Sequence, residues 1–228
     1  RRFLMKKFAL RILTPFLVAF LAGCGSSVPT QQRTSLPTIT SLKTISDMTE
    51  VGFEWNPVSD ESVVGYYLYR SNPNDANSKM QLVANIKDRF ATHYVDRDLA
   101  PETTYSYQMR TYSSNAISQP GAIATATTKP LLDSVPFAQA ITGLPGRVKV
   151  IWRPHPDSTV ASYIIQRSDA GANKFSQIAE VNGRLNAEYI DTEVKPGRSY
   201  EYRILVKTSS GVISKPSQNI SATTKELP

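Results

Sequence analysis

Apolar and polar residues alternate along most of this chain with a period of two. Val51, Phe53 and Trp55 alternate with polar or small neighbours, and residues 105–110 repeat the pattern. Asn-Pro, Pro-Asn and Pro-Gly pairs separate such runs, and no window of ten residues keeps a helical stripe. A period of two is typical of strands with one buried face. About seven short strands in each half of the chain therefore predict an all-β fold of the sandwich type.

The second half of the chain repeats the first with a shift of about 96 residues. Residues 51–55 (VGFEW) match 148–152 (VKVIW), and the run at 101–107 matches the run at 196–202. Solenoid repeats have periods of about 20 to 50 residues, so this period indicates duplicated domains. The predicted boundaries are a first domain at 36–129, a linker at 130–135 and a second domain at 133–226.

Each half carries residues that resemble a fibronectin type III domain. They include an early-strand tryptophan (Trp55 and Trp152), a Tyr-x-Leu/Ile-x-Arg motif and the run LAPETTYSY at 99–107. Tyr105 and Tyr200 match the tyrosine corner of that family, whose hydroxyl bonds back to the nearby backbone. The resemblance implies two tandem immunoglobulin-like β-sandwiches. It specifies a fold and not a function, because such sandwiches serve many roles.

The start of the chain has the pattern of an export signal. A basic stretch from Met5 to Arg11 precedes an apolar run that continues to Ala22. The run is too short for a transmembrane helix, which needs about 20 apolar residues, and it fits the apolar region of a signal peptide. We therefore expect Met5 to be the true start and residues 1–23 to be a signal peptide.

The chain has a single cysteine, and it follows this apolar run directly. The sequence Leu-Ala-Gly-Cys ending at Cys24 resembles the lipobox of bacterial lipoproteins. That resemblance implies cleavage before Cys24 and acylation of its thiol, for example with palmitate, and two acyl chains anchor a protein stably. Gly25 resembles the default for outer-membrane sorting. We expect a lipidated cysteine and flexible tether at 24–35, on an outer-membrane protein facing either the surface or the periplasm.

The formal net charge of +7 suggests nucleic acid or an acidic surface as a partner. Five of the basic residues precede Cys24, and no acidic residue precedes Asp47. Removing the export signal leaves 21 basic against 19 acidic residues, or +2. The first domain then carries about −2 and the second about +3. Nucleic acid is therefore not an expected partner.

The sequence predicts no catalytic centre, cofactor, metal site or small-molecule substrate. One cysteine excludes an internal disulfide and a multi-cysteine zinc site. His93 and His155 occupy positions that do not correspond between the halves. No phosphate-binding glycine loop or G-x-S-x-G motif is present. The acidic pairs at 60–61 and 96–98 favour turn and capping roles over a weak cation site.

The first half alone offers a candidate binding surface. Strand alternation places four residues outward on two neighbouring strands of one sheet: Tyr67, Tyr69, Arg110 and Tyr112. Tyrosine and arginine are enriched at binding hot spots, so we expect an exposed partner-binding patch. The alternatives are tyrosines that merely suit a strand surface, or a patch packed against the other domain. The second half has Ile164, Gln166, Leu205 and Lys207 at these positions.

These features together predict a non-enzymatic envelope lipoprotein that mediates protein–protein contact. The order of lipobox, short tether and tandem domains is similar to that of bacterial lipoprotein adhesins, which implies adhesion to a host matrix protein such as fibronectin. The chain contains no Arg-Gly-Asp sequence. The alternative is a periplasm-facing scaffold of an envelope machine such as a flagellar motor or secretion apparatus. A third option is an accessory module of a glycan-processing enzyme.

Overall fold

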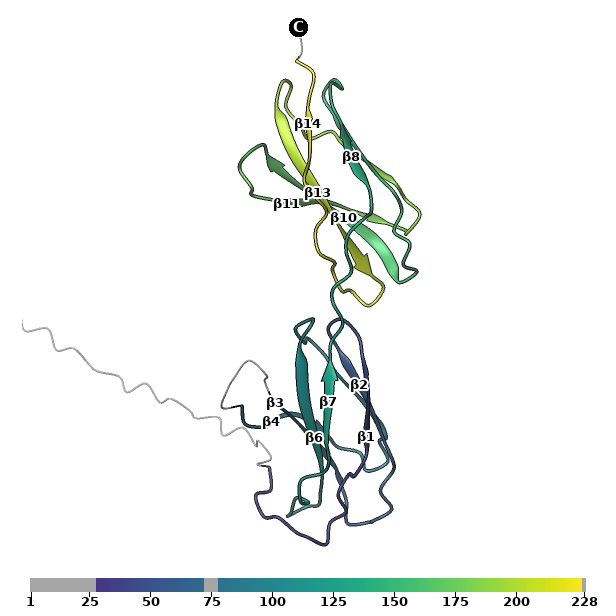
Figure 1. The fold of residues 1–228 in the computed structure, drawn as a ribbon, viewed down its shortest axis with the longest axis vertical. Coiled ribbons are helices and arrows are strands. Elements are labelled where there is room, and N and C mark those ends of the chain that lie inside the picture. Colours follow the sequence, from purple (N-terminus) through teal and green to yellow (C-terminus); the bar gives the residue numbers. More distant parts are fainter. Residues whose placement is uncertain (1–27, 72–77, 227–228) are drawn as a thin grey trace, which may run out of the picture.

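The computed structural model describes residues 28–71 and 78–226. Cys24 and the predicted signal peptide at 1–23 lie outside the described residues. The described residues form fourteen strands, arranged as two β-sandwiches that follow one another along the long axis (Figure 1). Within these two ranges, no helix has the length and apolar character needed to cross a membrane.

Domain 1 packs a three-stranded sheet on a four-stranded one. The first sheet has the order β1-β2-β5, with β1 (Leu42–Ser46), β2 (Val51–Trp55) and β5 (His93–Asp96). The second has the order β4-β3-β6-β7, with β3 (Gly65–Ser71), β4 (Gln81–Ile86), β6 (Thr104–Tyr112) and β7 (Ile123–Thr127). All neighbouring strands are antiparallel.

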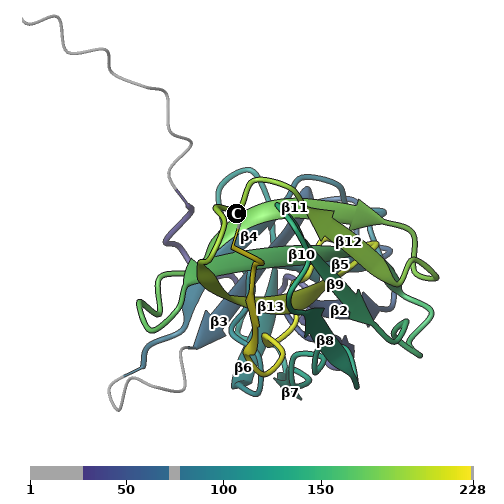
Figure 2. The same cartoon turned by 90° about the horizontal axis from the view of Figure 1, so that it is seen from above.

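Domain 2 has the same arrangement. Its sheet β12-β9-β8 contains β8 (Ala138–Ile141), β9 (Val148–Trp152) and β12 (Glu188–Asp191). Its sheet β11-β10-β13-β14 contains β10 (Val160–Asp169), β11 (Ser176–Asn182), β13 (Ser199–Thr208) and β14 (Ile220–Thr223). Seen from above, the two sandwiches project over one another (Figure 2). The predicted all-β class is confirmed.

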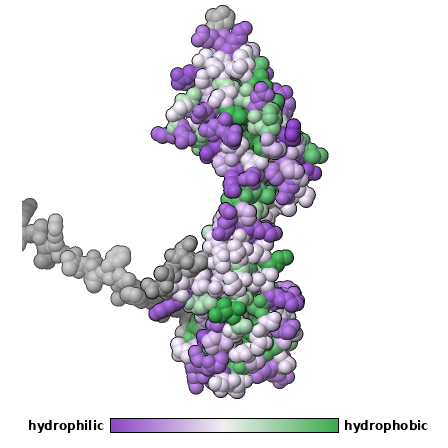
Figure 3. Space-filling view, in the orientation of Figure 1, coloured by the Kyte–Doolittle hydropathy of each residue, from purple (hydrophilic) through white to green (hydrophobic). Residues whose placement is uncertain are grey.

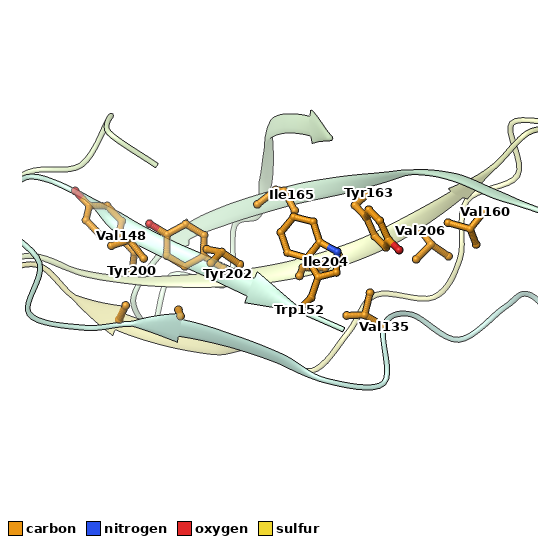
Figure 4. Packing of buried hydrophobic residues seen from close by; sticks show 13 residues of the cluster. Val135, Val148, Trp152, Val160, Tyr163, Ile165, Tyr200, Tyr202, Ile204 and Val206 are labelled. Atoms are coloured by element: carbon orange, nitrogen blue, oxygen red, sulfur yellow. The ribbon is translucent and has the colours of Figure 1, made fainter. Parts of the chain in front are cut away.

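The alternation in the sequence decides which side chains form the core of each sandwich. In domain 2 the tryptophan of β9 lies against the inward tyrosine of β10, with the ring centroids of Trp152 and Tyr163 5.1 Å apart (Figure 4). In domain 1 Trp55 and Tyr66 repeat this contact at 5.2 Å. The paired strands therefore bury equivalent faces, as a period of two requires.

A buried ion pair links the two sheets of domain 1. Arg70 of β3 contacts the carboxylate of Asp96 on β5 at 2.7 Å. The Tyr107 hydroxyl on β6 donates a hydrogen bond to the same Oδ2 at 3.0 Å. The carboxylate thus has two partners from the opposite sheet, which satisfies a charge that would otherwise be costly to bury.

Domain 2 repeats this ion pair almost without change. Arg167 contacts Asp191 at 2.7 Å, and the Tyr202 hydroxyl donates to Asp191 at 2.9 Å. Burial, reinforced by the neighbouring carboxylate, raises the pKa of Tyr107 and of Tyr202 well above the ordinary tyrosine value. Both hydroxyls therefore remain protonated donors over the ordinary pH range.

The tyrosine corner expected from the sequence is present in both domains. The backbone N–H of Ala100 donates to the Tyr105 hydroxyl at 3.0 Å. The backbone N–H of Lys195 donates to the Tyr200 hydroxyl at 2.9 Å. Each bond spans five residues and fixes the chain as it enters β6 or β13.

The chain is hydrogen-bonded to domain 1 just before the linker and to domain 2 within the linker. The Lys129 N–H donates to the Asp47 carbonyl of domain 1 at 3.1 Å. The Lys215 N–H of domain 2 donates to the Leu132 carbonyl at 3.0 Å. Leu132 also packs against the core of domain 2, and Val135 belongs to that core. Few linker residues are therefore left without a contact to either sandwich.

Candidate functional site

The four residues of the predicted patch lie on one side of domain 1. Tyr67 of β3 pairs in register with Arg110 of β6. The rings of Tyr67 and Tyr112 stack with centroids 4.2 Å apart, and the Arg110 guanidinium lies 5.6 Å from the centre of the Tyr69 ring. The prediction that strand alternation brings these side chains together is confirmed.

The predicted exposure of the patch is wrong for two of its members. Only 4% of Tyr67 and 7% of Tyr112 is exposed, and burial raises the pKa of both hydroxyls. They form a small cluster with Ile117, against which Val28 and Tyr69 pack. Tyr69 and Arg110 are half-buried. The sequence reasoning missed what covers them: Ile117, and a segment at Val28 that falls in the predicted tether.

We call this covering segment, residues 28–36, the N-terminal strap. The Ile117 N–H donates to the Gln31 carbonyl at 2.9 Å, and the Arg33 N–H donates to the Ile117 carbonyl at 2.9 Å. The strap thus adds one parallel bridge to the edge of the domain. The flexible tether predicted at 24–35 is corrected here: residues 31 and 33 are bonded to domain 1.

A second line of residues on the same face remains accessible. We call it the outer row; it crosses all four strands in register and consists of Leu82, Tyr69, Gln108 and Ile123. Ile123 is 64% exposed and Leu82 is 38% exposed. Their large apolar side chains lie at the two ends of the row, Leu82 beside the half-buried Tyr69 and Ile123 beside Gln108. The two ends of the outer row are therefore apolar and accessible.

At the position of the outer row, the corresponding face of domain 2 is polar. Gln166 pairs in register with Gln177 and Arg203, and the Arg203 Nε donates to the Gln166 side chain at 2.7 Å. Lys207, at the position of Tyr112, forms an ion pair with Glu180 at 3.1 Å. This face satisfies its own polar groups and offers no aromatic cluster. The two domains thus differ most on this sheet.

The other sheet of domain 1 carries a shallow apolar groove on its outer face. Ile45 and Val95 flank Gly52 in register, and the groove between them measures about 440 Å³. Ile45 is 76% exposed. A Cβ on Gly52 would meet the Ile45 Cγ2 at 3.0 Å, so the glycine lets this side chain lie over β2. Sequence reasoning did not single out these residues.

Domain 2 has no glycine at the matching place. Lys149 of β9 pairs in register with Ile141 and Ile190, as Gly52 does with Ile45 and Val95. Its ammonium group contacts Glu188 at 2.6 Å. A lysine side chain therefore crosses the place that forms the floor of the groove in domain 1.

The side chains considered for chemistry have structural roles. The Asp60 carboxylate accepts hydrogen bonds from the backbone N–H and the hydroxyl of Ser62, which lowers its pKa and supports the expected turn role. His155 is 7% exposed, and its Nδ1 accepts the Asp157 N–H at 3.1 Å. Across residues 28–71 and 78–226, no three His, Cys, Asp or Glu side chains gather in a way that could hold a metal ion.

Comparisons with known proteins give modest similarities. No protein-family model matches the chain. Exoglucanase B of Cellulomonas fimi is 26% identical over 212 residues, which cover 88% of this chain and 18% of that protein. Human usherin is 26% identical over 118 residues, covering 50% of this chain and 2% of that protein. The chain thus spans less than a fifth of the length of these relatives.

Among solved structures, the two-domain fibronectin type III segment of chicken tenascin is 17% identical. The alignment covers 83% of this chain and 99% of the tenascin segment, with a TM-score of 0.37. The strand order carries the assignment of the fold: three strands face four in each half, with a core tryptophan on the second strand and a tyrosine corner before the sixth. The described chain is a tandem pair of fibronectin type III-like β-sandwich domains.

Proposed function

We propose that this chain is a non-enzymatic envelope lipoprotein that makes protein–protein contacts through the groove over Gly52. The groove supports this function because it is an exposed apolar depression on a rigid sheet. An ion pair between Lys43 and Glu54, 3.6 Å apart, and His93 border it. A mobile apolar side chain of a partner can enter such a groove while polar groups at the rim set its orientation.

The partner we propose is a host matrix protein such as fibronectin. The support is the resemblance to bacterial lipoprotein adhesins such as fibronectin-like protein A, in which a lipid anchor, a tether and type III domains follow in the same order. Tandem fibronectin type III-like domains commonly act as interaction or accessory modules. Adhesion depends on exposed surfaces, and the outer faces of the sheets are where the two domains differ.

Capture on immobilised fibronectin tests both the partner and the groove. The soluble fragment 25–228 is compared with its Gly52→Lys variant, which imports the residue of domain 2. We expect the variant to bind at least about tenfold more weakly, because a lysine would cover the groove floor. The matched control, Lys149→Gly in domain 2, should bind like the wild type. Equal binding by Gly52→Lys contradicts the groove, and absence of wild-type binding contradicts fibronectin.

The lipid anchor is tested separately. Cells supplied with labelled palmitate should incorporate the label into the wild-type chain and not into a Cys24→Ala variant. Protease treatment of intact cells then distinguishes an adhesin from a periplasm-facing scaffold, since only a surface-exposed chain is removed. Resistance to the protease, together with palmitate labelling, would favour the scaffold of an envelope machine.

A second candidate function is that of an accessory module beside a glycan-processing enzyme. The similarity to Exoglucanase B favours it because that similarity runs through 88% of this chain and so involves both domains. Sedimentation of fragment 25–228 with insoluble glucan is the test. Retention on glucan with no retention on fibronectin would support this candidate over adhesion.

A further inference from the structure

The N-terminal strap fixes how far domain 1 can lie from Cys24. Val28 packs against the cluster of Tyr67, Tyr112 and Ile117. Val28 lies four positions after Cys24 in the sequence, so their Cα atoms are at most about 14 Å apart when the chain is extended. If Cys24 is acylated, as proposed above, this cluster lies within about 14 Å of the lipid headgroups.

The four-stranded sheet of domain 1 is free of acidic residues. Strands β3, β4, β6 and β7 contain no aspartate or glutamate, although domain 1 as a whole carries more acidic than basic residues. Arg70 points inward to its ion pair, whereas Arg110 lies on the outer face over Tyr69. The equivalent strands of domain 2 contain Asp169, Glu180 and Glu201. The face nearest the anchor is thus the one without carboxylates.

We propose that this face of domain 1, formed by the outer row and Arg110, rests on the lipid surface to which Cys24 tethers the chain. The proposal rests on the lipidation proposed above. Tyrosine is enriched at membrane interfaces, and an arginine beside it can bind lipid phosphate. Leu82 and Ile123, at the two ends of the row, supply apolar contact with the headgroup region.

The proposal also orients the groove over Gly52. The groove lies on the outer face of the opposite sheet of the same sandwich. When the β4-β3-β6-β7 sheet faces the lipid, the β1-β2-β5 sheet faces away from it. The same chain can then contact a membrane through one sheet and a protein through the other. On the side of the molecule that Figure 3 draws, hydrophobic and hydrophilic residues are intermingled on both domains.

The test uses the single cysteine as an artificial anchor. The mature chain 24–228 is coupled through Cys24 to maleimide lipid in vesicles of phosphatidylcholine and phosphatidylglycerol. Hydroxyl-radical footprinting with mass spectrometry compares it with the same chain capped at Cys24 in solution. We expect a several-fold loss of oxidation at Tyr69, Leu82 and Ile123 on vesicles. Ile45 and Leu185, which are exposed elsewhere, should react equally in both states.

A variant and a control make the result specific. Tyr69→Ser with Ile123→Ser should restore oxidation of Leu82 on vesicles, whereas Gln166→Ser in domain 2 should leave the wild-type protection unchanged. Unprotected Tyr69, Leu82 and Ile123 on vesicles overturn the proposal, as does protection that appears only when fibronectin is added. Because maleimide supplies the anchor, these results do not depend on lipidation in the cell, which palmitate labelling decides.

Discussion

Equivalent side chains stabilise the sandwich of domain 1 and that of domain 2, whereas the outer surfaces of the two domains differ. The ion pair between the sheets measures 2.7 Å in both, and the tyrosine hydrogen bond to it differs by only 0.1 Å, at 3.0 and 2.9 Å. Their outer faces share neither the tyrosine cluster nor the groove. Contacts that hold the sandwich are therefore kept between the copies, while exposed positions differ wherever the fold allows it.

The N-terminal strap gives the sharpest local contrast. Ile117 and Ile213 each form an isolated bridge to the adjacent strand, with Tyr112 and Lys207 respectively. Ile117 is also bonded to the strap and is 4% exposed. Ile213 is 43% exposed, and its backbone has no partner of this kind in the described part of the chain. One edge is thus covered by the protein's own chain and the other is open.

The largest expected effect comes from breaking the buried ion pair. Asp191→Ala should lower the free energy of unfolding of domain 2 by about 3–5 kcal/mol, because Arg167 loses its carboxylate partner and the buried Tyr202 hydroxyl loses its acceptor. Asp96→Ala should cost domain 1 less, since its carboxylate is 10% exposed and that of Asp191 is 1% exposed. Urea unfolding followed by tryptophan fluorescence measures both, because each domain has one tryptophan. An Asp96→Ala cost above that of Asp191→Ala would contradict this order.

A smaller effect is expected from the edge isoleucines. Ile117→Ser should lower the free energy of unfolding of domain 1 by about 2 kcal/mol, because it removes a buried side chain beneath the strap. Ile213→Ser should change domain 2 by less than about 0.5 kcal/mol, as for most exposed positions. Thermal unfolding of both variants measures the difference. Equal effects would show that the strap does not bury Ile117 in solution.

The tyrosine corners should respond alike in the two domains. Tyr105→Phe and Tyr200→Phe each remove the acceptor of one backbone N–H, and each should cost about 1–2 kcal/mol. Urea unfolding of the single variants gives both values. A cost confined to one domain would mean that the two corners, although alike in geometry, contribute differently.

The smallest effect is a dependence on alkaline pH. Burial raises the pKa of Tyr107 and of Tyr202 above that of the unfolded chain, about 10. Their contribution to stability is therefore complete below about pH 10 and is lost as the pH rises further, by at most about 1.4 kcal/mol per pH unit for each tyrosine. For each of these two tyrosines, the loss should stay under about 1 kcal/mol up to pH 10.5.

Urea unfolding in this pH range measures the slope for each domain. Tyr107→Phe should reduce the alkaline decline of domain 1 and leave that of domain 2 unchanged. An unchanged decline in domain 1 would assign it to another group.

The sequence predicts the fold well because the information is local. Val51, Phe53 and Trp55 alternate so strictly that the buried face follows directly, and the duplication repeats the signal. The tyrosine corner is equally predictable, since Tyr105 and Ala100 lie five residues apart in the sequence.

The sequence predicts the surface less well because covering segments carry little pattern. Ahead of the buried Leu36, the strap packs through one half-buried valine and two backbone hydrogen bonds, and neither leaves a periodic signal. Strand alternation places Tyr67 and Tyr112 on one face. Their burial also depends on Val28, which lies about 40 and 80 positions before them in the sequence. The groove depends on Gly52 having no side chain, which alternation alone does not reveal.

The parallel bridge between the strap and Ile117 has a mechanical consequence. A pull on the chain ahead of Val28 acts on the two backbone hydrogen bonds at Ile117 before it acts on the sheets. Once those bonds separate, residues 28–35 can extend to about 26 Å, because Leu36 stays buried against Val63 and Ala116. The strap therefore extends under force before either sandwich unfolds. Domain 2, which has no such strap in the described residues, follows domain 1 along the chain.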